Sequence, residues 1–204
     1  MSLWRASLPL VLASRSAARR AVLESAGIPL EVMVPAVDER AVEAQAAGAE
    51  AAPDDVARLL ARTKALAGSG LAGPEHYVVG ADQTLALCGT LFHKAGDRAA
   101  AKLQLSRLQG RTHMLHSAVA LVREEEVLFE TVVSASLTMR ALSDIEIEAY
   151  LDAAGPDILG SVGCYQLEAL GAHLFERIEG DHFTILGLPL LPLLGALRQE
   201  GLLA

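Results

Sequence analysis

One stretch of this sequence places an acid, an amide and a base close together. Residues 77–94 read YVVGADQTLALCGTLFHK, in which Asp82 and Gln83 follow an apolar run and Lys94 follows a Cys-Gly-Thr turn. A carboxylate can hold a metal ion or accept a proton, an amide can recognise a ligand, and an ammonium can bind an anion. The stretch predicts a site that activates water beside an anionic ligand. The alternative is an Asp that ends a strand and caps a turn.

A second group of polar residues surrounds the predicted start of a helix. Residues 12–20 read LASRSAARR, with Ser14 before the helix, Ser16 as its N-cap and Arg19 in its first turn. Exposed N–H groups, hydroxyls and the positive end of the helix dipole together favour phosphate. An arginine in the first turn opposes the dipole unless an anion is bound. The stretch therefore predicts a phosphate site, with a solvated arginine pair on an ordinary helix as the alternative.

Three further charged residues join the candidate set. Glu39 belongs to a pair of acids after a predicted strand, which either ligates a divalent ion or lies in a solvated loop. Lys64 falls beside the apolar face of a predicted helix. Glu168 lies in an apolar, glycine-spaced segment, where burial of an unpaired carboxylate costs several kcal/mol. We therefore expect Glu168 to have a partner or to face a cleft.

Several motifs of known enzyme classes are absent from the sequence. It contains no GxSxG and no GxxxxGK[ST]. Cys88 and Cys164 form no CxxC pair and are predicted to be buried thiols of a reducing compartment. His113 and His116 lie three apart in a predicted strand, where they point to opposite faces and do not share a metal. The remaining residues suit metal-assisted attack of water on a phosphate.

Composition limits the classes of partner. The chain has 204 residues, of which 52% are hydrophobic, and a net charge of −8. This length fits one domain or two small lobes sharing a cleft. An acidic chain without a basic stripe argues against nucleic-acid binding, and no apolar run is long enough to span a bilayer. Residues 1–23 have the basic, serine-rich composition of a transit peptide, but they also read as a strand followed by a helix; a cytoplasmic location is expected.

The elements that must position these residues alternate between strand and helix patterns, which predicts a mixed α/β fold. One helix is predicted to be capped by Asp54 or Asp55 and to end at residues 68–73. Another is predicted to start at Asp97 and to bury Leu103, Leu105 and Leu108. Strands are predicted at residues 8–13, 30–34, 77–79, 112–122 and 127–138, and further helices at 17–26, 143–153 and 188–197.

Short motifs recur along nearly the whole chain, from about residue 8 to residue 197, in the order of a known family. They resemble the Maf family of nucleoside triphosphate pyrophosphatases. The matching segments are LASRSAARR (12–20), VDER (37–40), GADQTLAL (80–87), HK (93–94), LQGRTH (108–113) and LFERIEGDHFTILGLPL (174–190).

The resemblance implies a fold like that of the inosine triphosphate pyrophosphatases: a single domain over residues 1–204, with a long mixed sheet and two lobes around a central cleft. It implies hydrolysis of a nucleoside triphosphate between its α and β phosphates, with Mg or Mn as cofactor. A homodimer is possible. The family name derives from septum formation in bacteria, so a non-catalytic nucleotide-binding regulator is the alternative of a different class.

The family's functional residues have matches in this sequence. Asp82 matches the catalytic acid, which accepts a proton; by the chemistry of their carboxylates, Asp82 and Glu39 are also the candidate metal ligands. The other matches are Lys94 and Glu39 in catalysis, and Ser14, Ser16, Arg19 and Lys64 in binding the triphosphate.

Base specificity follows two positions that differ between branches of the family. The branch acting on dTTP and UTP has Thr after the catalytic Asp and Gln in the late segment, whereas the 7-methyl-GTP branch has Gln and Glu. This chain has Gln83 and Glu168, which suggests a 7-methyl-GTP-like substrate, with dTTP or UTP as the alternative. Ala18 departs from both branches, which have Trp or Arg there.

Overall fold

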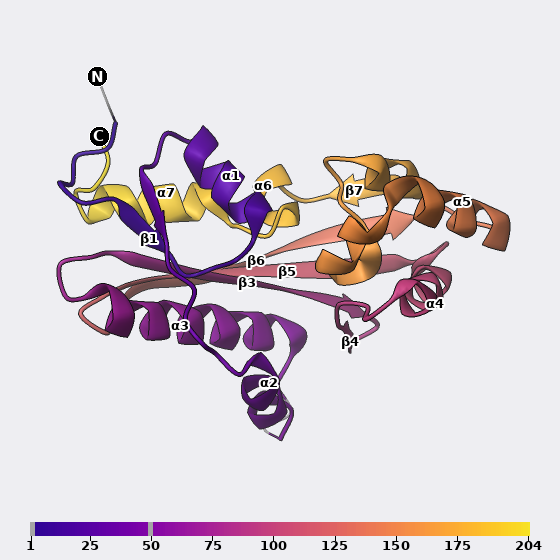
Figure 1. The fold of residues 1–204 in the computed structure, drawn as a ribbon, viewed down its shortest axis with the longest axis horizontal. Helices are drawn as coiled ribbons and strands as arrows, with labels where there is room; N and C mark the ends of the chain where they lie inside the picture. Colours follow the sequence, from indigo (N-terminus) through magenta and orange to yellow (C-terminus); the bar gives the residue numbers. More distant parts are fainter. Residues whose placement is uncertain (1–2, 49–50) are drawn as a thin grey trace.

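The computed structural model describes residues 3–48 and 51–204, which form a seven-stranded mixed sheet with helices on both faces (Figure 1). This confirms the predicted mixed α/β class. The strands are β1 (Leu10–Leu12), β2 (Leu30–Val32), β3 (Val78–Leu87), β4 (Thr90–Phe92), β5 (Thr112–Arg123), β6 (Glu126–Met139) and β7 (Phe175–Glu179). The α-helices are α1 (Ala17–Ser25), α2 (Glu39–Gly48), α3 (Pro53–Ala72), α4 (Arg98–Leu108), α5 (Asp144–Ala154), α6 (His182–Ile185) and α7 (Leu190–Gln199).

The sheet is built on β3, whose neighbours change along its length. The strand order is β2-β1-β3-β5-β6-β7, and β4 also pairs with β3. β5 runs antiparallel to β3 from Val78 to Ala86, whereas the parallel neighbour β1 pairs only with Val78 and Val79. β4 folds back onto β3 from Leu85. Between these two partners, residues 80–84 have no strand on one side within the described part of the chain, so the sheet opens there.

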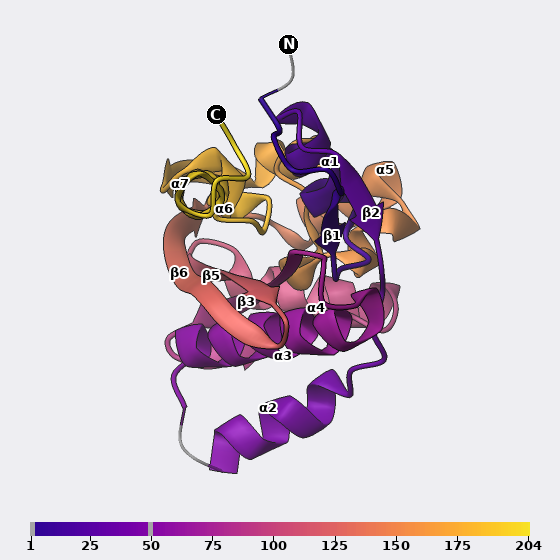
Figure 2. The ribbon, with the colours of Figure 1, turned by 90° about the vertical axis from the view of Figure 1, so that its left-hand side faces the viewer.

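Helix α3 covers one face of the sheet, and α2 lies beyond it (Figure 2). The helix packs closely because small residues face the strands. Ala57, Ala61 and Ala65 are buried, and a Cβ at Gly80 would lie 2.2 Å from the carbonyl oxygen of Ala61. Glycine at position 80 therefore lets α3 lie against β3, which brings Lys64 over the open part of the strand.

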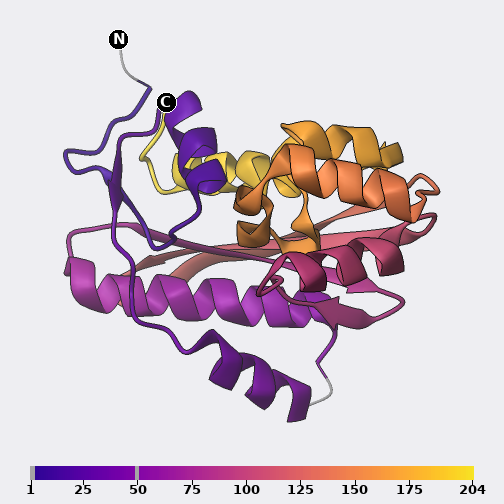
Figure 3. The same ribbon diagram turned by 45° about the vertical axis from the view of Figure 1, so that its right-hand side comes forward.

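Two hydrophobic clusters fill the opposite face. One joins β1 and α1 to α7, with Leu10, Leu23 and Leu193 fully buried. The other lies under α4 and α5, which pack together at the end of the sheet away from α7 (Figures 1 and 3). The predicted arrangement of two lobes around one cleft stays a prediction. No helix within residues 3–48 and 51–204 is long and apolar enough to cross a bilayer.

Several local predictions differ from the structure. Asp82 lies in the middle of β3 rather than at a strand end, because β3 continues along β5 to the hairpin. Ala52, without a side-chain hydrogen bond, caps α3, and the two acids of residues 54–55 lie in its first turn. The end of the helix agrees with the prediction, since α3 stops at Ala72 with Gly73 as its C-cap; Gly68 lies within its last turns, where the missing Cβ leaves room for Ala13 and Val78. Leu103 is exposed, and so is Cys88, whereas Cys164 is buried as predicted.

Candidate active site

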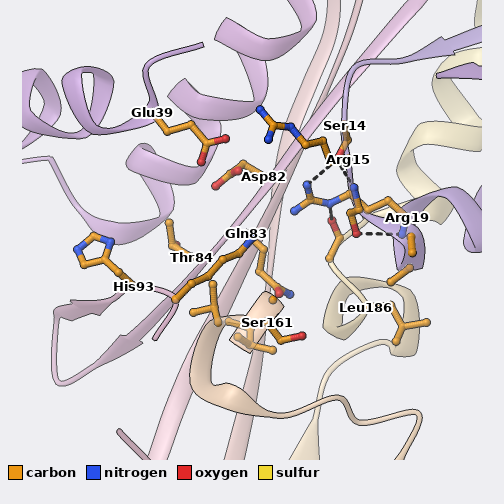
Figure 4. Close-up of a pocket in the computed structure, with 18 of the residues that line it drawn as sticks. Ser14, Arg15, Arg19, Glu39, Asp82, Gln83, Thr84, His93, Ser161 and Leu186 are labelled. Carbon is orange, nitrogen blue, oxygen red and sulfur yellow. Dashed lines mark hydrogen bonds between the residues drawn. The ribbon is translucent and has the colours of Figure 1, made fainter. Parts of the chain in front are cut away.

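A cavity of about 930 Å³ opens where β3 has lost its neighbour β1 (Figure 4). Its walls come from the β1–α1 turn, the first residues of α2, the middle of α3 and β3, the turn after β4, and residues 160–168 and 185–187. It is lined by every predicted site residue: Ser14, Ser16, Ala18, Arg19, Glu39, Lys64, Asp82, Gln83, Lys94 and Glu168.

The Arg19 guanidinium forms one end of the cavity. Ser16 caps α1 by accepting a hydrogen bond from the Arg19 backbone N–H, as predicted. The side chain, 9% exposed, donates from Nε to the Gly187 carbonyl at 2.8 Å and from Nη1 to Ala81 O at 2.8 Å and Ser14 Oγ at 3.1 Å. These contacts leave Nη2 without a hydrogen-bond acceptor among the described residues. A buried cation with two remaining N–H donors at a cavity is suited to an anion.

The surroundings of Arg19 act on its pKa in two directions. Burial lowers the pKa of the guanidinium below its usual value, and the negative charges of Asp82 and Glu39 oppose that shift. Since the usual value lies far above neutrality, Arg19 keeps its charge. The cavity therefore presents a fixed positive group on the β1–α1 side and carboxylates on the α3 side.

Three charged side chains meet on the α3 side. Lys64 Nζ lies 2.5 Å from Asp82 Oδ1 and 2.9 Å from Glu39 Oε1. The side chains of Lys64 and Asp82 are each 12% exposed, whereas that of Glu39 is 54% exposed. Figure 4 shows Glu39 and Asp82 pointing toward one another from α2 and β3. The ammonium therefore compensates two acids that would otherwise repel each other.

These acids also bear on the predicted metal. Among the described residues, no group of three or more His, Cys, Asp or Glu side chains is arranged to hold an ion. Two carboxylates nevertheless fit Mg²⁺, which proteins commonly bind through one or two carboxylates together with substrate phosphates and waters. Asp82 and Glu39 have the right chemistry for such an ion, and Lys64 contacts one oxygen of each carboxylate.

Gln83 points to the face of β3 opposite to Asp82, as neighbours in a strand must. Its Nε2 lies 2.9 Å from Ser117 Oγ on β5 and 3.1 Å from each of the carbonyl oxygens of Thr184 and Ile185. The side-chain nitrogen is thus directed into the protein at the end of α6. This contact set is fixed by the register, which places Gln83 directly opposite Ser117.

The remaining predicted residues lie nearer the solvent. Lys94 is exposed in the turn after β4, and Ala18 is half-buried on α1. Glu168 is exposed and lines the cavity, so of the two outcomes expected for it, the structure shows the cleft-facing one.

The sequence predictions missed Arg15, Thr84 and Gly187, among other residues of the cavity. Arg15 extends from the β1–α1 turn toward Glu39 and Asp82 (Figure 4). Its position between the two serines of LASRSAARR was the available signal. Thr84 donates to the Pro53 carbonyl at 2.8 Å and so ties the start of α3 to β3. Gly187 has φ +93°, and a Cβ there would lie 3.5 Å from Arg19 Nη2. Only tertiary contacts reveal these last two.

The two histidines point to opposite faces of β5, as predicted. His116 contacts Ser134 at 2.7 Å, whereas His113 is 1% exposed and contacts the hydroxyl of Tyr165, another cavity residue, at 2.7 Å. Burial lowers the pKa of His113 to about 4, so its ring is neutral at neutral pH. His113 therefore supports the wall behind Tyr165.

Comparison with known proteins gives full-length matches. A nucleoside triphosphate pyrophosphatase of Rhodopseudomonas palustris is 56% identical over 204 residues, 100% of both chains. A 7-methyl-GTP pyrophosphatase of Rhizobium etli is 51% identical over 192 residues, 94% of this chain and 96% of the relative. A crystal structure of a dITP/XTP pyrophosphatase from Mycobacterium abscessus, 23% identical, covers 66% of this chain and 76% of its own with a TM-score of 0.35, too low to carry a conclusion.

A family model described as Maf-like protein matches residues 9–200. This span includes every predicted site residue and every element from β1 to α7, and it confirms the family predicted from the motifs. The chain belongs to the Maf-like protein family.

Proposed function

We propose that this protein is an enzyme that hydrolyses a nucleoside triphosphate to the monophosphate and pyrophosphate. The observation that carries the proposal is that one cavity is lined by both a buried guanidinium, Arg19, and a buried carboxylate, Asp82. The relatives named nucleoside triphosphate pyrophosphatase support the same activity over the full length of the chain.

The cations of the cavity bind the triphosphate. Arg19 binds a phosphate through Nη2, which has no acceptor among the described residues. Arg15 and Lys94, both exposed on the cavity wall, neutralise further phosphate oxygens. Lys64 contributes through the acids: by compensating Asp82 and Glu39, it lowers the repulsion that an incoming triphosphate meets.

Asp82 is the proton acceptor in the proposed reaction. A water oxygen attacks the α phosphorus, and the bond from that phosphorus to the oxygen bridging to the β phosphate breaks. Pyrophosphate leaves with the bridging oxygen, and the water proton goes to the Asp82 carboxylate. The rigid setting of Asp82 in the middle of β3, paired on one side with Ala118 of β5, keeps this base in place.

Asp82 and Glu39 are the residues that would hold Mg or Mn. Such an ion would supply charge compensation for the phosphates when bound. Since Lys64 contacts the same two carboxylates, its ammonium would compensate their charge together with such an ion.

For the base, we propose a 7-methyl-GTP-like nucleotide. Gln83 and Glu168 line the cavity, and a guanine edge presents N–H donors that their oxygens can accept. A carboxylate would repel the O4 acceptor of uracil or thymine. The relative named 7-methyl-GTP pyrophosphatase supports this choice. Ala18 offers no aromatic face for a cationic base, so stacking is not part of the proposal.

The test is pyrophosphate release from 7-methyl-GTP, GTP, dTTP, UTP and CTP, with Mg and with Mn. We expect release with 7-methyl-GTP to be fastest, and Asp82→Asn to lower kcat by at least about 100-fold. Asp55→Asn is the matched control, because Asp55 lies exposed on α3 with only Arg58 at 3.4 Å. Preference for dTTP or UTP would overturn the base assignment alone. Tight nucleotide binding without pyrophosphate release would overturn the enzyme and favour a nucleotide-binding regulator.

A further inference from the structure

The amide of Gln83 has only one possible orientation. Two of the three atoms around Nε2 are backbone carbonyl oxygens, those of Thr184 and Ile185, each at 3.1 Å. Carbonyl oxygens accept and never donate, so the NH₂ group must face them. Turning the amide over would set three oxygens against one another in the interior. Oε1 therefore points the other way, and its position follows from chemistry rather than from a choice between nitrogen and oxygen.

Ser117 completes this arrangement from the neighbouring strand. Its hydroxyl is fully buried and donates to the Thr184 carbonyl at 2.7 Å. Since its single proton is used there, Ser117 Oγ accepts from Gln83 Nε2 at 2.9 Å. The Thr184 carbonyl also takes the Gly187 N–H at 3.0 Å. The two hydrogens of the Gln83 amide thus have Ser117 Oγ and Ile185 O as their least crowded acceptors.

The opposite end of the amide faces the cavity. No hydrogen-bond donor of residues 3–48 or 51–204 lies against Gln83 Oε1. This oxygen is nevertheless not one of the fully buried side-chain atoms without a hydrogen-bond partner, so it is accessible from the cavity. It would lie 3.7 Å from a Cβ at Gly187, a position that also lines the cavity. Position 83 therefore offers the ligand an acceptor, and its donors are all consumed by the protein.

We infer that Ser117 is a positioning residue that holds Gln83 as an obligate hydrogen-bond acceptor, so that the site selects a base whose ring edge presents an N–H donor. This inference rests on the proposed function and narrows its substrate class. Guanine presents a ring N–H beside an amino group, which suits two acceptors, Gln83 Oε1 and the Glu168 carboxylate. Adenine and cytosine present an unprotonated ring nitrogen at the corresponding place, which Oε1 repels.

The first experiment compares GTP with N1-methyl-GTP, in which a methyl group replaces the ring N–H, and UTP with N3-methyl-UTP. With the wild-type protein we expect methylation to lower kcat/KM by roughly two orders of magnitude or more. In Ser117→Ala the amide still faces the two carbonyl oxygens but loses the acceptor on β5, so Oε1 is held less firmly in place and this ratio falls by about tenfold. Mere steric rejection of the methyl group would persist in the variant.

Ser134→Ala is the matched control, because Ser134 lies on β6 of the same sheet and its hydroxyl contacts His116 at 2.7 Å. It should leave the ratio unchanged. Equal turnover of methylated and parent nucleotides by the wild-type protein would overturn the inference, and so would an unchanged ratio in Ser117→Ala.

A second readout does not depend on turnover. Calorimetry with GMP and N1-methyl-GMP should show the same discrimination in the dissociation constant, with the same loss in Ser117→Ala. If no nucleotide releases pyrophosphate but this discrimination persists, the proposed hydrolysis fails and the inference stands. If pyrophosphate is released but neither pair is discriminated, the inference fails and the hydrolysis stands.

Discussion

Lys64 Nζ lies 2.5 Å from Asp82 Oδ1, which joins the middle of α3 to the middle of β3 at the wall of the cavity. The contact depends on how closely the helix approaches the strand. Because residue 80 is a glycine, the α3 backbone can lie against β3, and Lys64 then reaches Asp82, two residues further along the same face of the strand. Both side chains are 12% exposed, so solvent screens this pair less than the ion pairs on the surface.

Replacing Lys64 by Gln should make the protein more dependent on a divalent ion. Without the ammonium, Asp82 and Glu39 repel each other, so the unliganded protein should lose about 1–3 kcal/mol of its free energy of unfolding. Mg or Mn would then restore more stability than it adds to the wild-type protein. Thermal unfolding with and without each ion measures this difference. Arg62→Gln, on the exposed side of α3, is the control; equal metal-induced shifts in all three proteins would argue against a metal on these carboxylates.

Arg19→Lys should impair both stability and substrate binding. A lysine ammonium cannot reproduce the planar donor set that contacts Gly187, Ala81 and Ser14, so we expect a loss of about 1–3 kcal/mol. Loss of the phosphate-binding Nη2 should raise KM by at least about tenfold. Urea unfolding and steady-state kinetics measure the two effects. Arg20→Lys is the control, because Arg20 is exposed and forms an ion pair with Glu24 on the same helix; an equal rise in KM there would refute the role of Arg19.

Gly187→Ala tests the space between Arg19, the proposed phosphate-binding residue, and Gln83, the proposed base-binding residue. The residue has φ +93°, so a side chain costs about 1–2 kcal/mol of stability. The new methyl would also lie 3.4 Å from Arg19 Nε and 3.7 Å from Gln83 Oε1, which narrows the cavity between them. Gly27→Ala carries the same backbone strain, with φ +74°, but meets no atom within 4 Å. Stability should fall in both variants and kcat/KM only in Gly187→Ala.

His113 should make stability depend on pH in the acid range. Burial lowers its pKa to about 4, whereas in the unfolded chain the pKa is about 6.5. The unfolded state therefore binds more protons between these values. The contribution of neutral His113 is complete above pH 6.5 and is lost as the pH falls toward 4, by about 3 kcal/mol in total.

Urea unfolding at pH 7.5, 5.5 and 4 measures this dependence. His113→Phe should reduce the fall in stability on acidification, although loss of the contact with the Tyr165 hydroxyl lowers stability at neutral pH. His173→Phe changes an exposed histidine and should keep the wild-type pH dependence. If His113→Phe also keeps it, the buried ring does not cause the acid sensitivity.

Local chemistry explains which elements were predictable. The Ser143–Glu146 capping box and the Ser16 cap act within one helical turn, and both are formed. The β3–β4 hairpin follows from Cys88 and Gly89, which adopt φ values of +50° and +78°. These signals depend on neighbours in the sequence, so they are readable without the fold.

The failed predictions involve contacts from distant segments. The apolar run of residues 77–79 predicts a strand that ends before Asp82, but β3 continues along β5, and β1 stops pairing after Val79, which leaves the acid beside a cavity. Leu103 was predicted to be buried, but it faces solvent, while Leu105 and Leu108 on the same helix are buried. The apolar pattern alone does not say which leucines meet the sheet.

The order and chemistry of the motifs were sufficient to determine the family, the mixed α/β class and ten of the residues that line the cavity. Packing decided which contacts each of these side chains makes. Lys64 contacts Asp82 and Glu39, and the Gln83 nitrogen is directed toward Ser117 and the end of α6. The type of a side chain limits which interactions it can make. Its actual partners depend on strand register and helix approach, which arise only when distant segments pack together.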